Sequence, residues 1–474
     1  MAVSSVWHTP AAISWLQALL SERLGQTFDL QMQPGKTRIS VHLPGDPRCI
    51  TLALDGATFA RADSELPCTY WNASAEGWHS AQLGNLPAPG AVQLSKPLIV
   101  AAEGGWHIDY DILGLAYWML TRQEEVRRTD LDQHGRFSSI SSHAFKHGYL
   151  MRPVVDEWLL VLKRVIQALW PTLELKCSEF SVCLSHDVDS PARYGFSTPM
   201  GFFRSVAGDL LIRKSLRAAL RAPGLYWGGR DQLDPNDPLN TFDWLMDRSE
   251  ECGLKSAFHF ICGRTNPARD ALYDIDQPAI RKLIRRISDR GHEIGLHPSF
   301  ETYLDADAIA TEAARLKKVC GEEGVHQDFW GGRMHYLRWR HPETMRAWET
   351  ARMDYDSTLG YPETPGFRCG TCNEYQAFDP VSLRALNLRI RPLVAMDVSV
   401  IANEYLGLGQ SPDALAMFKK AIDACKAVGG MFSLLWHNSQ LETPADKALF
   451  CRVLAEACAG PHKKQHAGFC FAMK

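Results

Sequence analysis

The chain has 474 residues, of which 46% are hydrophobic and 22% charged, and its 51 Lys and Arg against 54 Asp and Glu leave a formal net charge of −3. This bulk balance gives no sign of a nucleic-acid or membrane-surface partner, and no apolar run approaches the roughly 18 residues that a membrane helix needs. The length exceeds what one hydrophobic core normally organises, so we expect a globular protein of two domains, one of them large.

Thirteen cysteines are scattered along the chain without the spacing of a disulfide framework, and their number is odd. The first residues lack the basic stretch and apolar core of a leader peptide. These features predict reduced thiols in a cytoplasmic protein. Cys369 and Cys372 have redox or zinc spacing, but no second pair follows, so we interpret them as structural thiols.

The first 175 residues predict a small α+β domain. Thr9 as N-cap, Pro10 and a closing Gly25 mark a helix, and alternating apolar residues at 39–43 and 50–54 predict half-buried strands. Further helices are predicted from residue 108 onward and at 153–171. Between these two helices lies a charged loop. Four polar residues at the start of the first helix and in this loop could line a site, but we interpret them as caps and ion pairs. They are Asp109, Asp111, His134 and Arg136.

From residue 176 to 474 the pattern alternates between strand and helix, which predicts an α/β fold with a parallel sheet, open or closed into a barrel. The predicted strands are 181–184, 256–261, 293–296, 327–330, 355–358 and 431–435. The predicted helices are 240–252, 280–290, 305–319, 342–352 and 412–428.

A helical insertion at about 191–238 interrupts this alternation and is partly basic. Its basic residues are Arg204, Arg213, Lys214, Arg217 and Arg221. We interpret the insertion as a solvated amphipathic face, with a lid or a contact for an anionic substrate group as the alternatives.

Four short segments place acids, bases and metal ligands where strands are predicted to end. They are residues 185–189, 292–298, 333–336 and 434–438. In the first, Asp187 and Asp189 are two residues apart and therefore project to one face of the strand. Because chemistry collects at the C-terminal ends of parallel strands, the four segments predict one shared site.

In their order and spacing, Ser-His-Asp-Val-Asp, Gly-His-Glu-Ile-Gly-Leu-His, Arg-x-His-Tyr and Leu-Leu-Trp-His resemble the motifs of the polysaccharide deacetylase (NodB-homology) family, carbohydrate esterase family four. The resemblance covers roughly Ser181 to Asn438. The chain is similar in particular to a bacterial subgroup in which an uncharacterised N-terminal domain precedes the deacetylase-like part. This resemblance implies a distorted (β/α) barrel of about seven parallel strands with a divalent metal, zinc first, at its mouth.

The resemblance also implies roles for individual residues. Asp189 and His297 match metal ligands, and Glu301 stands where most of the family has a second metal histidine. A carboxylate can ligate zinc, iron or manganese, and a helical turn opening at Pro298 would bring Glu301 beside His297. The open alternatives are His292 or His335 as the further ligand, or no metal at all.

Among the catalytic positions, Asp187 matches the base, Arg333 the arginine that holds it, and His437 the general acid. Asp397 is placed to orient His437. The candidates for the substrate groove, where aromatic faces suit sugar rings and arginine suits an anion, are Tyr336, Trp339 and Arg368.

The implied activity is metal-dependent removal of an N-acetyl group from an acetamido sugar in surface polysaccharide biosynthesis. In the cytoplasm the substrate would be a nucleotide- or lipid-linked glycan precursor. The alternatives are hydrolysis of another non-peptide C–N bond, such as that of a cyclic amide, and an inactive sugar-binding or assembly component that keeps the barrel. The sequence leaves the oligomeric state open.

Overall fold

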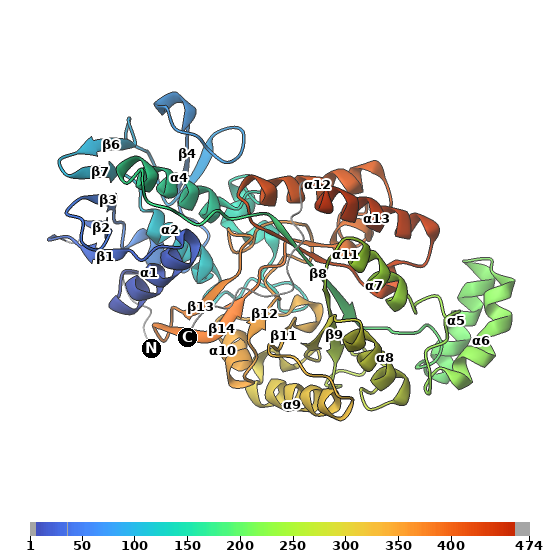
Figure 1. Ribbon diagram of the computed structural model, residues 1–474. Coiled ribbons are helices and arrows are strands. Elements are labelled where there is room, and N and C mark those ends of the chain that lie inside the picture. The colour runs from blue at the N-terminus through green and yellow to red at the C-terminus, as the bar shows by residue number, and fades with distance from the viewer. Residues whose placement is uncertain (1–5, 36, 460–474) are drawn as a thin grey trace.

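The computed structural model describes residues 6–35 and 37–459, and Figure 1 shows their arrangement. In the N-terminal part, five strands form a mostly antiparallel sheet in the order β1-β2-β3-β7-β6 within the described ranges. The strands are β1 (Asp29–Met32), β2 (Arg38–His42), β3 (Cys49–Ala53), β6 (Ile99–Ala102) and β7 (Gly105–Ile108). The alternation at 39–43 and 50–54 therefore predicted β2 and β3 correctly.

Helix α1 (Pro10–Leu24) begins and ends where its caps predict. The Thr9 hydroxyl accepts the N–H of Ala12 at 3.2 Å, and Gly25 closes the helix with φ 73°, a left-handed conformation that glycine adopts without strain. The helix also reaches the second half of the chain, because Trp15 Nε1 donates to the carbonyl oxygen of Gln376 at 2.9 Å.

The rest of the N-terminal part consists of a two-stranded sheet and three helices. These elements are β4 (Cys68–Trp71), β5 (Leu86–Pro89), α2 (Ile112–Leu120), α3 (His143–Lys146) and α4 (Val154–Leu169). Asp111 caps α2 by accepting the N–H of Gly114 at 2.7 Å, as interpreted from the sequence. Short 3-10 turns across the chain lie at Thr58–Ala60, Ser74–Glu76, Gln123–Glu125, Ser139–Ser141, Thr302–Leu304, His335–Leu337 and Asn438–Gln440.

The second half of the chain forms a larger sheet, whose order among the described residues is β13-β14-β12-β11-β10-β9-β8-β16-β15. Neighbouring strands are parallel except for the β13–β14 hairpin. Its strands are β8 (Ser181–Val188), β9 (Ser256–Ile261), β10 (Glu293–His297), β11 (Gly331–Gly332), β12 (Tyr355–Asp356), β13 (Tyr375–Asp379), β14 (Arg384–Ile390), β15 (Ala395–Met396) and β16 (Met431–Leu435).

The mixed α/β class and the parallel sheet agree with the sequence, but the expected barrel of about seven strands is not seen as a closed structure. Within residues 6–35 and 37–459, the sheet ends in β13 on one side and in β15 on the other. The strand predicted at 327–330 lies instead at Gly331–Gly332. A Cβ at Gly332 would lie 1.8 Å from the carbonyl oxygen of Leu296, so this strand requires glycine and lacks the usual strand residues.

Helices flank the large sheet on both sides in Figure 1, with α8, α9 and α10 below it and α12 and α13 above it. The helices after β8 are α5 (Pro199–Leu211), α6 (Leu216–Gly228), α7 (Phe242–Glu251), α8 (Pro278–Asp289), α9 (Ala306–Glu322), α10 (Glu343–Thr350), α11 (Asp397–Ile401), α12 (Pro412–Ala427) and α13 (Pro444–Cys458). The helices beside the sheet turn their apolar faces to it; in α8 the buried side chains include Ile280, Leu283, Ile284 and Ile287.

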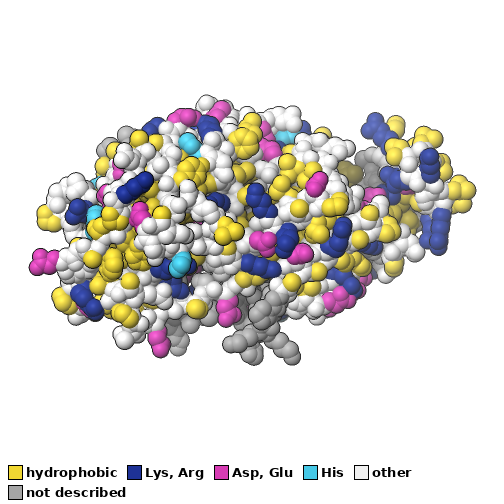
Figure 2. Space-filling view, turned by 90° about the horizontal axis from the view of Figure 1, so that it is seen from above, with side chains coloured by type: hydrophobic (Ala, Val, Ile, Leu, Met, Phe, Trp, Pro, Cys, Tyr) yellow, Lys and Arg dark blue, Asp and Glu magenta, His cyan; other side chains and the backbone are white. Residues whose placement is uncertain are grey.

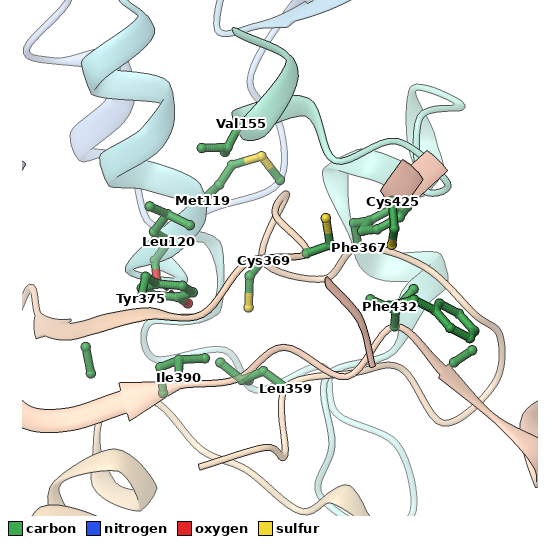
Figure 3. Packing of buried hydrophobic residues seen from close by; sticks show 14 of the residues in the cluster. Met119, Leu120, Val155, Leu359, Phe367, Cys369, Tyr375, Ile390, Cys425 and Phe432 are labelled. Carbon is green, nitrogen blue, oxygen red and sulfur yellow. Dashed lines mark hydrogen bonds between the residues drawn. The ribbon is translucent and has the colours of Figure 1, made fainter. Parts of the chain in front are cut away.

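One hydrophobic core spans both sheets. Figure 3 shows Met119 and Leu120 of α2 and Val155 of α4 facing Cys369 and Tyr375 of the second half. The hydroxyl of Tyr375 donates to the carbonyl oxygen of Leu120 at 2.8 Å. Apolar packing and this hydrogen bond therefore join the N-terminal part directly to the second half of the chain.

The twelve cysteines within the described ranges are free thiols. Cys369 and Cys372 are fully buried in the core, in agreement with a structural role. In the described part of the chain, no helix combines the length and apolarity required to traverse a bilayer.

Candidate metal and catalytic site

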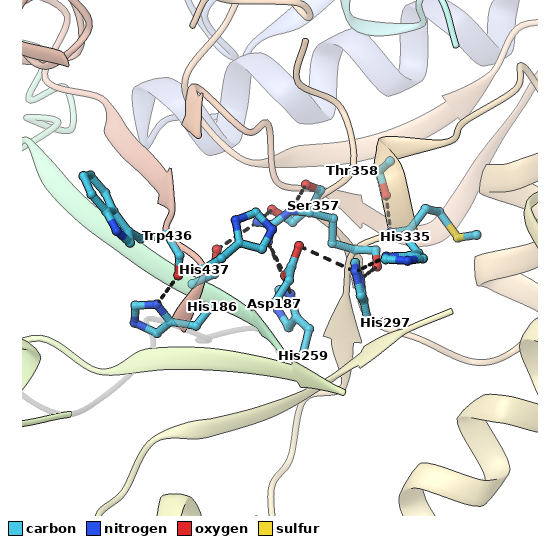
Figure 4. A network of polar contacts seen from close by, with 12 residues as sticks. His186, Asp187, His259, His297, His335, Ser357, Thr358, Trp436 and His437 are labelled. Carbon is cyan, nitrogen blue, oxygen red and sulfur yellow. Dashed lines mark hydrogen bonds and ion pairs between the residues drawn. The ribbon is translucent and has the colours of Figure 1, made fainter. Parts of the chain in front are cut away.

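Polar side chains gather at the C-terminal ends of the parallel strands (Figure 4). Six strands contribute, and all of these residues except His259, which lies inside β9, come from the end of a strand or from the residues after it. The side chains are Asp187 and Asp189 from β8, His259 from β9, His297 from β10, Arg333 and His335 after β11, Asp397 after β15, and His437 after β16. Strand order therefore brings residues from positions 187 to 437 to one edge of the sheet.

Three of these residues form a group that could hold a metal ion. Among the described residues, Asp189, His297 and His335 each offer a ligand atom, and these atoms all lie within 4.8 Å of one another. Asp189 Oδ1 lies 3.3 Å from His297 Nε2 and 3.6 Å from His335 Nδ1. The two imidazole nitrogens are 3.0 Å apart.

The hydrogen bonds on the outer side of each imidazole decide which atoms face this group. His297 Nδ1 lies 2.5 Å from the carbonyl oxygen of Arg333, and His335 Nε2 lies 3.0 Å from that of Arg269. Because a carbonyl oxygen only accepts, each outer nitrogen carries a proton, which leaves His297 Nε2 and His335 Nδ1 as lone pairs when the two rings are neutral, as metal ligands are. Two acceptors therefore face each other across the group.

The Asp189 carboxylate also presents an oxygen without a hydrogen-bond donor within the described ranges. Its Oδ1 is buried and has no hydrogen-bond partner among the residues that the structure describes. Burial raises the pKa of Asp189, but the positive charge of His335 and His297 in their protonated forms outweighs burial and lowers it to about 2, so the carboxylate is ionised. A bound cation would supply this charge when both rings are neutral. Two lone pairs and a buried carboxylate oxygen fit a divalent cation.

Glu301 does not join this group, and its assignment as a metal ligand is corrected here. The chain after β10 does not continue into a helical turn, and the 3-10 turn begins only at Thr302. The Glu301 side chain is 48% exposed, and its Oε2 accepts from Arg338 Nη1 at 2.8 Å. His335, one of the alternatives from the sequence, occupies the third position because β11 lies beside β10.

His292, the other alternative, lies at the opposite end of β10 from this group. Its Nδ1 accepts the N–H of Ser256 at 3.0 Å, and its Nε2 lies 3.2 Å from Glu250 Oε1. Both ring nitrogens are therefore engaged in holding β9 and α7, and we assign no metal role to His292.

Asp187 lies beside the metal group and is held by two donors on one oxygen. Its Oδ1 accepts from Arg333 Nη1 and from His259 Nδ1, each at 2.8 Å, whereas its Oδ2 lies 3.8 Å from His297 Nε2. Burial raises the pKa of Asp187, but Arg333 and His297 outweigh burial and hold it well below the usual range. Asp187 is therefore an oriented carboxylate with one oxygen turned toward the metal group.

Arg333 is itself fixed by the strand ends around it. It is fully buried, and its guanidinium donates to Ser185 Oγ at 2.9 Å and to the carbonyl oxygen and hydroxyl of Ser357, each at 3.0 Å. These hydrogen bonds hold the guanidinium in one orientation, in which it donates to Asp187.

His259 belongs to the site but was missed in the sequence analysis. It pairs directly with Asp187 in the register of β8 and β9, and burial lowers its pKa to about 4, so the ring is neutral. Gly295 of β10 makes room for it, because a Cβ there would lie 2.3 Å from His259 Cδ2. The available signal was a histidine within the apolar run Ser256–Ile261.

His437 and Asp397 form a second pair on the other side of the metal group. His437 Nδ1 lies 2.8 Å from Asp397 Oδ1, and His437 Nε2 lies 3.7 Å from Asp189 Oδ2. Burial lowers the pKa of His437, but the neighbouring Asp397 carboxylate outweighs burial and raises it to about 10. The ring is therefore cationic near neutral pH.

Of the three expected substrate contacts, only Tyr336 lies beside the site. Its half-buried ring packs edge-on against His335 with centroids 4.7 Å apart, and the Arg269 guanidinium lies 5.4 Å from its centroid. Trp339 and Arg368 are buried, at 2% and 1% exposure, so their assignment to the substrate groove is wrong. Arg368 donates instead to both carboxylate oxygens of Glu125, at 2.9 and 2.6 Å.

The charged loop of the N-terminal part reaches this flank of the site. Arg136 pairs with Asp132 at 2.7 Å, as interpreted from the sequence, and also donates to the carbonyl oxygen of Tyr336 at 3.0 Å. The His134 ring lies 5.2 Å from that of Tyr336. The loop therefore supports the segment that carries Tyr336.

Comparisons with known proteins give a partial picture. A family model described as a family of unknown function (DUF7033) matches residues 50–171. No curated protein matches the chain.

Three solved structures resemble parts of the chain, each covering 60% of it. A Mycobacterium smegmatis protein described as a polysaccharide deacetylase has 18% identity and a TM-score of 0.38, with 85% of that chain covered. Puue allantoinase has 12% identity and a TM-score of 0.37, also with 85% covered. A Pseudomonas aeruginosa PAO1 protein described as a polysaccharide deacetylase has 15% identity and a TM-score of 0.35, with 86% covered. Since all three likenesses are low, the proposed function rests on the site residues.

Proposed function

We propose that this protein is a metal-dependent hydrolase that removes the N-acetyl group from an acetamido sugar, as a glycan or as an activated or lipid-linked precursor, in surface polysaccharide biosynthesis. The observation that carries the proposal is that a three-ligand group, an oriented carboxylate and a cationic histidine face one another. Asp189, His297 and His335 form the group, with Asp187 and His437 beside it.

Zinc is the first candidate for the ion. Two imidazole nitrogens and one carboxylate oxygen match the three protein ligands that catalytic zinc sites use, although the same set also suits iron or manganese. A bound divalent ion would polarise the amide carbonyl and lower the pKa of water, the two demands of amide hydrolysis.

Asp187 is the proposed base. Its Oδ1 is occupied by Arg333 and His259, which leaves Oδ2, on the side of His297, to take the proton from the attacking water. Arg333 keeps the Asp187 carboxylate ionised and fixes its direction. Because Arg333 lowers the pKa of Asp187, it also makes Asp187 a weaker base.

His437 is the proposed general acid. With Nδ1 bound to Asp397, the proton that can be given away is on Nε2, which faces Asp189 at 3.7 Å. An amine leaves only when protonated, so a histidine held cationic at this position supplies the second proton transfer. Asp397 acts through His437 as a positioning residue.

Tyr336 and Arg269 are the proposed contacts for the substrate. A half-buried aromatic ring beside the site suits the face of a sugar, and the exposed Arg269 guanidinium over it suits an anionic group such as a precursor phosphate. Both residues are joined to the metal group through His335, whose ring contacts Tyr336 and whose Nε2 donates to the Arg269 carbonyl oxygen.

The test is acetate release by the purified full chain loaded with zinc. We expect acetate from N-acetylglucosamine oligomers or from UDP-N-acetylglucosamine, and a loss of at least about 1,000-fold in Asp187→Asn with zinc retained. Asp307→Asn, an exposed carboxylate in α9, is the matched control and keeps full activity.

Two other outcomes would replace the proposal. Ring opening of hydantoin without acetate release would show hydrolysis of a different C–N bond. Zinc binding with neither reaction, together with retention on an immobilised acetamido sugar, would identify a sugar-binding component.

A further inference from the structure

The helical insertion forms a hairpin that projects from the body of the molecule. In Figure 1, α5 and α6 extend away from both sheets at the right of the view. The inward faces of the hairpin make a small core of their own, in which Phe202 and Val206 pack on Tyr194, Ala222 and Leu225. Its stability therefore does not require its outer faces to be covered.

The outer faces are nevertheless apolar. Among the described residues, half of the exposed large hydrophobic side chains, eight of sixteen, fall within α5, α6 and the turn between them. Their exposed fractions lie between 44% and 80%. They are Met200, Phe203, Leu210 and Leu211 on α5, Ile212 in the turn, and Leu216, Leu220 and Trp227 on α6.

The spacing of these side chains places them on one face of each helix. Met200, Phe203 and Leu210 stand at i, i+3 and i+10 on α5, and Leu216, Leu220 and Trp227 stand at i, i+4 and i+11 on α6. Such spacing aligns side chains in one stripe. The outer faces are exposed, as the solvated face interpreted from the sequence requires, but a helix face that meets only water usually carries polar residues, and these stripes are apolar.

The charge of the hairpin is strongly positive. Residues 198–230 contain six basic side chains and one acidic side chain, against a formal net charge of −3 for the whole chain. Asp209, the acidic one, is buried and paired with Arg193 at 3.3 Å and with Arg213 at 2.6 Å. Figure 2 shows dark blue and yellow side chains together on this lobe.

The base of the hairpin is anchored to the body close to the end of β8. Arg193 forms ion pairs with Asp209 and Glu442, and its N–H donates to Asp237 Oδ1 at 2.8 Å. Arg193 therefore ties the C-terminal end of α5 to the body a few residues after Asp189, while the apolar stripes and the basic side chains of the hairpin stay exposed.

We propose that the α5–α6 hairpin docks the protein on an anionic lipid surface. The outward stripes would enter the boundary between headgroups and acyl chains, and Lys214, Arg217 and Arg221 would meet lipid phosphates. Charge complementarity selects this occupant, because a basic apolar face without an accessible acid matches anionic lipid, whereas a second copy would oppose like charges. The proposal is independent of the proposed function.

The test is flotation of the full-length protein with lipid vesicles. We expect binding to phosphatidylcholine vesicles that contain about 30% phosphatidylglycerol, at least about tenfold weaker binding to pure phosphatidylcholine, and a similar loss in about 1 M salt, where the Debye length is short.

Two triple variants separate the charged and apolar contributions. Lys214→Gln with Arg217→Gln and Arg221→Gln should weaken binding by about fivefold for each residue, on the order of 100-fold together. Leu211→Ser with Ile212→Ser and Leu220→Ser should weaken it by at least about tenfold. The matched controls are exposed residues elsewhere and should bind like the wild type: Lys318→Gln with Lys420→Gln and Arg452→Gln, and Leu83→Ser with Val92→Ser and Ile140→Ser.

Because all these side chains are exposed, the melting temperature and the zinc content should not change, and these two measurements identify a folding defect. The proposal is overturned if the wild type does not float with anionic vesicles, or if the control triples lose as much binding as the hairpin triples. It is also overturned if light scattering shows a dimer that only the apolar triple dissociates, because the face would then bind a second copy.

Discussion

Both oxygens of the Asp397 carboxylate bind His437: the ring Nδ1 lies 2.8 Å from Oδ1, and the backbone N–H of the same histidine donates to Oδ2 at 2.6 Å. This double contact joins the start of α11 to the end of β16 and fixes the ring, so that Nε2 faces the metal group. A carboxylate used in this way sets both the tautomer and the charge of the histidine.

Asp397→Asn should therefore slow acetate release by about 100- to 1,000-fold without loss of zinc. The neutral amide no longer raises the pKa of His437 from its ordinary value toward about 10, so the ring loses its proton at lower pH. A general acid is active below its pKa, and the alkaline limit of kcat should move to lower pH in the variant. The pH profile of kcat checks this, with Asp413→Asn in α12 as the control; an unchanged alkaline limit would contradict the assignment.

His335→Ala should weaken zinc binding by at least about 100-fold, whereas Glu301→Ala should leave it unchanged. The reason is that His335 Nδ1 faces Asp189 and His297, while Glu301 is turned outward to Arg338. Zinc titration of the apoprotein and metal analysis after dialysis measure both variants. Loss of zinc in Glu301→Ala with retention in His335→Ala would reverse our assignment of the third ligand.

His259→Phe should lower kcat by about 10- to 100-fold and leave zinc bound, because Asp187 would lose one of the two donors that orient it. Gly295→Ala should act in the same direction, since its Cβ would meet the His259 ring at 2.3 Å. Steady-state kinetics with metal analysis test this, and the exposed His326→Phe is the control. If His259→Phe had full activity, His259 would be a structural residue only.

Glu125→Gln should destabilise the fold by about 3–5 kcal/mol at neutral pH, because it leaves Arg368 buried without its carboxylate and leaves Arg122 with Glu124 alone. Burial raises the pKa of Glu125, but the two arginines outweigh burial and lower it to about 2. A lowered carboxyl pKa stabilises the folded state above the unfolded pKa and loses this contribution as pH falls toward the folded pKa.

The difference between wild type and Glu125→Gln should therefore shrink between about pH 4.5 and about pH 2. Denaturant unfolding across this range measures it. Glu65→Gln, which removes an exposed ion pair with Lys146, is the comparison and should change stability by less than about 1 kcal/mol. A difference that stayed constant down to pH 2 would show that the charge of Glu125 does not stabilise the fold.

Much of the fold was predictable because it depends on local patterns. The caps of α1, the apolar face of α8 and the buried run of β16 agree with the structure, since each pattern is complete within one segment. The hairpin of β13 and β14 was not predicted, and β11 lies a few residues from its expected place. Both depend on partners far along the chain: Gly332 pairs with β10, where no side chain fits.

In the candidate site, the order of motifs was enough to place Asp187, Asp189, His297, Arg333 and His437 at the same edge of the sheet. Spacing alone failed for Glu301, because a helical turn was assumed after Pro298 and the chain does not form one. His259 was overlooked because only the pairing of β9 with β8 brings it to Asp187.

The order of residues along this chain thus determines which strands and helices form and which of their ends carry acids, bases and metal ligands, because periodicity and capping act over a few residues. The folded arrangement decides which of these side chains share a partner. Arg368 illustrates the difference: its charge suggested an anion site, but Glu125, 243 positions earlier, neutralises it in the core. A buried charge is satisfied by whatever the fold brings within hydrogen-bond distance, and no local pattern encodes that distance.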